Sequence, residues 1–164
     1  MASHFLLCLC LASGLLAAAS GCGENKNPAS GCPSGWTQFG SRCFIFYFSE
    51  RNWMDAETYC ISIGGNLASV HSADEHFFLR SMIKRVSGRY RETWIGGFDS
   101  VEDGVWMWSD GSKFDYIRWA SNEPDVSNTQ QHCVEMNRNR NYWGDTNCNS
   151  KKPHVCSKNM MTPP

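Results

Sequence analysis

The spacing of hydrophobic residues changes between residues 42 and 65. The run "RCFIFYFS" at 42–49 is a continuous stretch of aromatic and β-branched residues, which is typical of a β-strand. From residue 53 to residue 63 the apolar side chains (Trp53, Ala56, Tyr59, Cys60 and Ile63) instead recur at the spacing of one helix face. The pair Gly64-Gly65 ends this pattern. The region therefore predicts a strand followed by a helix.

A second amphipathic segment runs from Ser72 to Gly88. Ser72 and Glu75 have the spacing of a capping box, in which the side chains at a helix start satisfy free backbone N–H groups. We interpret His76 as a surface residue of this helix. The stripe expected to be buried consists of Phe78, Met82, Ile83 and Val86.

The second half of the chain contains short apolar runs separated by long polar loops. They are "TWIGG" (93–97), "VWMWS" (105–109), "CVEMN" (133–137), "NYWGD" (141–145) and "HVCS" (154–157). Each has the length and residue types of a short strand. Two early helices followed by many short strands predict an α+β domain. Trp119 and Trp143 flank an acidic loop, which makes them candidates for the border of a binding site.

The N-terminal segment differs from the rest. Residues 5–19, "FLLCLCLASGLLAAA", form an uncharged apolar run that is short for a membrane span. We interpret residues 1–20 as a cleaved secretory signal peptide, although a membrane anchor is the alternative for such a run. Residues 21–31 are polar and predict a flexible lead-in to one domain at 32–158, with a tail at 159–164. A secreted, extracellular protein is expected.

Nine cysteines are consistent with export to an oxidising compartment. Cys8 and Cys10 fall in the predicted signal, and Cys22 stands alone just after it. Six remain in the domain (Cys32, Cys43, Cys60, Cys133, Cys148 and Cys156), and six cysteines allow about fifteen disulfide pairings. A zinc site is the competing reading, but no two of these six have the short spacing of typical zinc ligands.

Charge and motifs argue against two classes of function. The formal net charge of -1 gives no sign of the basic surface that binds nucleic acid. The histidines have no serine or cysteine partner in a recognisable nucleophile motif, so an enzyme is not expected.

The order of several motifs resembles the C-type lectin domain. These motifs are "CPSGWTQFGSRCF", "WMDAETYCISIGGNLASVHSADEH", "WIGG", "WMWSDGSKFDYIRW", "EPD" and "WGDTNCNSKKPHVC". The resemblance covers residues 32–157 and is closest to short, secreted fish lectins that are related to type II antifreeze proteins. It implies a disulfide-linked fold of two helices, short antiparallel strands and a long loop region.

The resemblance also implies three disulfides, Cys32 with Cys43, Cys60 with Cys156, and Cys133 with Cys148. This pairing leaves Cys22 over. A leftover cysteine in a secreted chain suggests a disulfide-linked homodimer, with a capped or buried thiol as the alternative.

In sugar-binding members of this family, a calcium ion is held by a Glu-Pro-Asn or Gln-Pro-Asp triplet and by residues farther along the chain. The positions that match here are Glu123, Asp125, Gln131 and Asp145, with Pro124 expected to follow a cis peptide bond. Gly144 stands where the family has asparagine. Three carboxylates remain, because the extra acid of the triplet offsets Gln131. The same four residues are the expected carbohydrate contacts, but the lost amide donor predicts weakened sugar binding.

The resemblance implies a secreted, calcium-dependent lectin for galactose-type or mannose-type glycans that acts in innate defence. One alternative is a lectin-like domain that binds a protein partner without sugar. A second is an ice-binding protein of the antifreeze type, although the subgroup with five disulfides has cysteines where this chain has Ser100, Ala120, His132 and Tyr142.

Overall fold

The computed structural model describes residues 31–125, 127–128 and 130–160. The predicted signal peptide, the lead-in up to residue 30, Cys22 and the end of the tail lie outside the described residues. Two helices and eight strands follow one another as β1 Thr37–Phe39, β2 Arg42–Arg51, α1 Trp53–Ser62, β3 Asn66–Leu67, α2 Ala73–Ser87, β4 Thr93–Phe98, β5 Met107–Trp108, β6 Cys133–Arg138, β7 Tyr142–Thr146 and β8 Lys152–Asn159.

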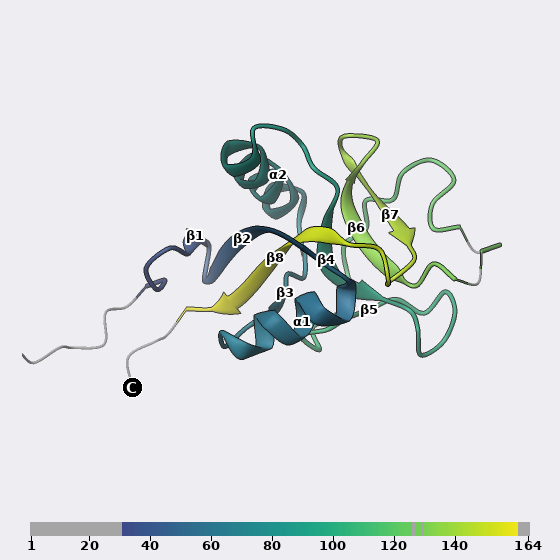
Figure 1. Ribbon diagram of the computed structural model, residues 1–164, viewed down its shortest axis with the longest axis horizontal. Helices are drawn as coiled ribbons and strands as arrows, with labels where there is room; N and C mark the ends of the chain where they lie inside the picture. The colour runs from purple at the N-terminus through teal and green to yellow at the C-terminus, as the bar shows by residue number, and fades with distance from the viewer. Residues whose placement is uncertain (1–30, 126, 129, 161–164) are drawn as a thin grey trace, which may run out of the picture.

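The strands form one sheet in the order β1-β2-β8-β4-β6-β7, with β3 beside β8 and β5 beside β4. All pairs are antiparallel except β4 and β8, which are parallel where Trp94 lies opposite His154. In Figure 1 the helices α1 and α2 lie on opposite sides of β2 and β8, and the long loops lie at the β7 end. The α+β class predicted from the sequence is confirmed.

The aromatic run of β2 alternates between two cores. Phe44 and Phe46 pack with Leu79 and Ile83 of α2 in the first core. Their neighbours Ile45 and Tyr47 point to the opposite face, where they pack against the core that contains Cys60 and Trp94. Because successive side chains of a strand face opposite sides, a strand covered by helices on both faces is apolar throughout. This explains the continuous hydrophobic run.

Both helices begin at polar caps. Asn52 accepts a hydrogen bond from the backbone N–H of Asp55 at 2.7 Å, and Ser72 accepts one from that of Glu75 at 3.1 Å. The Glu75 carboxylate does not complete a capping box on Ser72, because it accepts from the backbone N–H of His71 at 2.8 Å and from Arg42 at 2.7 Å.

The buried face of α2 differs from the predicted one. Met82 and Ile83 are buried and Phe78 is partly buried, but Val86 is 58% exposed. His76 is fully buried, so its interpretation as a surface residue was wrong. The indole Nε1 of Trp143 donates to His76 Nδ1 at 3.1 Å, which provides the imidazole with a partner inside the core.

Three disulfides link the chain as the family resemblance implied. Cys32 is joined to Cys43, Cys60 to Cys156, and Cys133 to Cys148. The second connects α1 to β8 over a sequence separation of 96 residues. Within residues 31–125, 127–128 and 130–160, no helix has both the length and the apolar character needed to cross a membrane.

Candidate functional site

The acidic loop is attached to the sheet by backbone hydrogen bonds on both sides of Trp143. The N–H of Trp143 donates to the carbonyl of Arg118 at 2.7 Å, and that of Ala120 donates back to the Trp143 carbonyl at 2.8 Å. This pairing places Glu123, three residues after Ala120, next to Gly144 and Asp145 of β7. The peptide bond between Glu123 and Pro124 is cis, as expected. Trp143 itself is fully buried and belongs to the core, so it offers no exposed surface to a ligand.

Asp125 and Asp145 are brought together directly. The backbone N–H of Asp125 donates to Asp145 Oδ1 at 3.0 Å and lies 3.2 Å from Oδ2. The Asp125 carboxylate is oriented in turn by Ser127, whose N–H and hydroxyl donate to Oδ1 at 3.1 and 2.6 Å. Asp145 is only 2% exposed. The two acidic side chains are therefore held by the loop in defined positions.

The surroundings of Glu123 shift the pKa of its carboxyl group. Burial is the main cause that raises its pKa to about 7, and the neighbouring Asp145 carboxylate adds to the rise. The guanidinium of Arg138, whose Nε donates to Glu123 Oε1 at 3.0 Å, acts in the opposite direction and lowers the pKa. Among the described residues, the buried Glu123 Oε2 has no hydrogen-bond partner.

Gln131 precedes β6, and its side chain contributes a second buried oxygen, Oε1, without a hydrogen-bond partner in the described part of the chain. Its backbone N–H donates to the carbonyl of Asn128 at 3.1 Å, which fixes the turn before Cys133. Among the described residues no hydrogen bond joins the Gln131 side chain to the three acids, whereas Asp145 accepts from the backbone N–H of Asp125 and lies beside Glu123.

The donors present suit a hard cation. The four predicted ligands offer carboxylate and amide oxygens only, and two of these oxygens, Glu123 Oε2 and Gln131 Oε1, are buried without a partner. Calcium prefers six to eight oxygen ligands, several of them charged. The chemistry of the donor set therefore fits calcium, which these side chains would hold together with water or ligand oxygens.

Arg138 is a residue of this site that the sequence analysis missed. Besides Glu123, it contacts Glu135 through Nη1 at 3.2 Å and the backbone carbonyl of Asp145 through Nη2 at 3.3 Å. A basic residue three positions after Glu135 was visible in the sequence, but its approach to Glu123 depends on the way the loop folds back.

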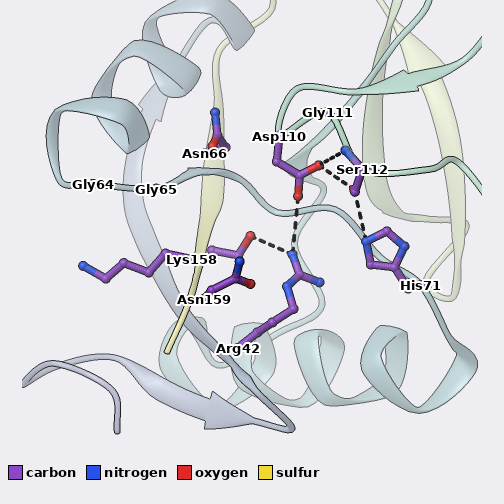
Figure 2. A pocket seen from close by; sticks show the side chains of 11 residues that line it. Arg42, Gly64, Gly65, Asn66, His71, Asp110, Gly111, Ser112, Lys158 and Asn159 are labelled. Carbon is purple, nitrogen blue, oxygen red and sulfur yellow. Dashed lines mark hydrogen bonds and ion pairs between the residues drawn. The ribbon is translucent and has the colours of Figure 1, made fainter. Parts of the chain in front are cut away.

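A separate polar cavity of about 510 Å³ lies near the start of β2 and the end of β8 (Figure 2). Its lining includes Arg42, His71, Asp110, Ser112, Lys158 and Asn159. Arg42 donates to the Oγ atoms of Ser69 and Ser157 at 2.7 and 2.9 Å, so its guanidinium connects β2, β8 and the segment before α2. Arg42 in the cavity wall therefore stabilises the fold by linking these segments.

His71 in this cavity lies near two serine hydroxyls, a proximity that the sequence motifs did not indicate. The Ser112 Oγ is 3.2 Å from His71 Nε2, and His71 Nδ1 is 3.0 Å from Asp115. The Ser112 hydroxyl, however, donates to Asp110 Oδ1 at 2.5 Å, so its proton is not directed to the imidazole. A nucleophilic serine requires its neighbouring base as hydrogen-bond acceptor, and this arrangement does not provide one.

A two-helix, disulfide-linked sheet with an oxygen-rich loop site defines a class of binding domain, and the comparisons with known proteins identify it. Residues 49–158 match the family described as "Lectin C-type domain". The chain belongs to the C-type lectin family. Members of this family similar to it are non-enzymatic, and the chain is not an enzyme.

Two fish proteins are among its similar relatives. The galactose-specific lectin nattectin of Thalassophryne nattereri is 45% identical over 147 residues, which are 88% of this chain and 92% of the relative. Ladderlectin of Oncorhynchus mykiss is 47% identical over 139 residues, which are 84% of this chain and 72% of the relative. Among solved structures, herring type II antifreeze protein superposes with a TM-score of 0.74 at 34% identity, over 79% of this chain and 100% of the other. The predicted relation to fish lectins and type II antifreeze proteins is thus confirmed.

Proposed function

We propose that this chain is a secreted lectin that binds galactose-type or mannose-type glycans through a calcium ion held by Glu123, Asp125, Gln131 and Asp145. The observation that carries the proposal is the placement of the Glu123 side chain and the Asp125 backbone beside the Asp145 carboxylate, together with the unpartnered oxygens of Glu123 and Gln131. Its likeness to a galactose-specific lectin supports a sugar ligand, and we propose galactose before mannose for this reason.

Calcium, when bound, would accept two neighbouring sugar hydroxyls as ligands, as in the sugar-binding members of the family. Side chains of this chain would then form hydrogen bonds with the sugar hydroxyl groups. Asp125 and Glu123 can accept from them, whereas Gln131 alone can donate an amide N–H to a hydroxyl oxygen. The asparagine that would supply a second donor is replaced by Gly144, and a missing hydrogen bond costs about 0.5–1.5 kcal/mol. We therefore expect low affinity for single sugars.

Low affinity for one sugar is compatible with strong binding to a surface that carries many. A dimer linked through Cys22 would present two sites, and linking sites raises the effective affinity without new contacts. We expect the secreted protein to migrate as a dimer on non-reducing electrophoresis and Cys22→Ser to migrate as a monomer. Such a bivalent lectin would suit recognition of microbial surfaces in innate defence.

A protein-binding role without sugar is the second candidate, and one specific observation favours it. Arg138 already neutralises Glu123, so the carboxylate has an alternative to a metal ion. An ice-binding role is the third candidate, and the structural likeness to a type II antifreeze protein supports it.

Titration calorimetry of the secreted protein with calcium chloride tests the proposal, and Asp145→Asn serves as the isosteric control. We expect a binding heat that the variant loses, and retention on immobilised galactose or mannose that EDTA abolishes. Absence of heat at millimolar calcium, with no retention on either sugar, would refute the calcium-dependent mechanism. Thermal hysteresis of ice growth, measured on the same sample, would then separate the ice-binding candidate from the protein-binding one.

A further inference from the structure

The loop site contains a positive charge supplied by the protein itself. We propose that Arg138 is the resident cation of this site and that it competes with calcium for the Glu123 carboxylate. This inference rests on the proposed function, since it concerns the calcium affinity of the same site. It follows from three features: the space that Arg138 occupies, the groups that it contacts, and the ion pair between Lys152 and Glu135 that remains if Arg138 moves away.

The space exists because residue 144 is glycine. Gly144 lies in β7 opposite Glu135 of β6. A Cβ atom at this position would lie 2.6 Å from Nε and 3.1 Å from Cγ of Arg138, and 3.2 Å from Glu123 Oε1. A contact of 2.6 Å would force the arginine side chain to shift from its observed position. The loss of the asparagine side chain expected from the family thus makes room for the guanidinium.

The contacts of Arg138 resemble those of a bound ion. Its three nitrogens reach Glu123 Oε1 at 3.0 Å, Glu135 Oε1 at 3.2 Å and the Asp145 carbonyl at 3.3 Å. Glu123 and Glu135 are almost inaccessible, with side-chain exposures of 13% and 0%. The contact with Glu135 is an ion pair, whereas that with Glu123 is a charge-assisted hydrogen bond, which is stronger than one between neutral groups. Arg138 therefore holds Glu123 in place when no metal ion is bound.

A calcium ion bound to Glu123 would lie next to this guanidinium. Like charges at close range repel, most strongly where the surroundings exclude water. Arg138 can move away, because its side chain is 29% exposed and belongs to the end of a hairpin. Its departure leaves Glu135 paired, since Lys152 Nζ lies 2.6 Å from Glu135 Oε2. Calcium binding and the Arg138–Glu123 ion pair thus oppose each other, and the arginine lowers the calcium affinity.

Two substitutions weaken the contact between the guanidinium and Glu123 by different means. Arg138→Gln removes the charge, and Gly144→Ala introduces the Cβ that collides with the arginine while leaving it in the chain. Gly144 does not have a positive φ, so alanine is compatible with its backbone. Arg140→Gln is the matched control: it removes an equal charge from the same hairpin, where Arg140 is exposed.

Calcium titration of the wild type and the three variants tests whether Arg138 lowers the calcium affinity. Near-ultraviolet circular dichroism checks that each protein is folded. We expect Arg138→Gln and Gly144→Ala to bind calcium at least about tenfold more tightly than the wild type, since a neighbouring charge shifts ion binding by a factor of this order. The control should bind like the wild type. Binding by the two variants but not by the wild type would support the inference while refuting calcium dependence of the natural protein.

The inference fails if the wild type binds calcium and neither variant binds it more tightly, an outcome that leaves the proposed function intact. It also fails if neither the wild type nor the variants bind calcium, because competition predicts a gain on removing the arginine. A gain in Arg140→Gln equal to that in Arg138→Gln would show an effect of net charge only, and would equally overturn the specific role of Arg138.

Discussion

Acidification should destabilise the fold through two buried histidines, His76 and His154. Both side chains are fully inaccessible. Burial is the main cause that lowers the pKa of each to about 4 from the ordinary value of 6.5, and the nearby Arg118 and Arg51 lower it further for His76 and His154, respectively. Both therefore remain neutral in the folded protein at pH 5, at which the same groups are protonated in the unfolded chain.

The sign of the effect follows from these pKa values. The unfolded state binds more protons between pH 6.5 and 4, so the contribution of each histidine is present above pH 6.5 and is lost as the pH falls toward 4. Between pH 7 and pH 5 the loss is about 2 kcal/mol for each histidine. Glu123 acts oppositely: its raised pKa of about 7 gives a stabilising contribution at acidic pH that is lost as the pH rises through 7.

Comparison of variants with the wild type cancels the contribution of Glu123. We expect His76→Gln and His154→Gln each to lose about 2 kcal/mol less stability than the wild type between pH 7 and pH 5. The assay is urea unfolding followed by tryptophan fluorescence, with the disulfides intact and EDTA present. Glutamine retains an acceptor for the Trp143 indole at position 76. Parallel pH profiles for the wild type and both variants would refute the reasoning.

Three further tests probe the framework of the fold by urea unfolding at pH 7. Replacing both Cys60 and Cys156 by alanine should cost about 4–5 kcal/mol, because that disulfide closes a loop with a separation of 96 residues; a loss below 1 kcal/mol would contradict the loop-closure argument. Arg42→Met should cost about 3 kcal/mol by leaving the buried Glu75 carboxylate unpaired, and a second change, Glu75→Gln, should restore part of the loss. Ser72→Ala should cost about 1 kcal/mol through the lost helix cap; no measurable change would show that the cap is dispensable.

The helices were predictable from the sequence because their signals are local. Apolar spacing and cap residues located α1 and α2 to within a residue or two of their observed limits. The order of strands was not predictable in this way, since the parallel contact of β4 with β8 joins residues that are 60 positions apart. His76 was misplaced because polar character favours the surface, whereas its partner, the Trp143 indole, is supplied by a distant strand.

The role of Arg138 could not be predicted from the alternation of β6. Met136 is buried in the core, and regular alternation would place residue 138 on the same face. The pairing of β6 with β7 shifts register between residues 136 and 138, where Asn137 has a φ of 71°. A bulge of this kind moves the following side chain to the other face of the strand. Arg138 consequently lies beside Glu135 and reaches Glu123.

Arg138 and Gly144 also explain why a count of carboxylates misjudges the site. Glu123, Asp125 and Asp145 have the charge of an ordinary calcium site, but the arginine cancels one of the three. Calcium affinity in oxygen sites depends on the number of charged ligands and on their rigidity. With two uncompensated carboxylates, we expect an affinity of about 10⁻⁴–10⁻³ M, the range of extracellular calcium modules. In the proposed calcium site, glycine at position 144 would therefore be more than the loss of a ligand, because it leaves room for a charge that we expect to weaken calcium binding.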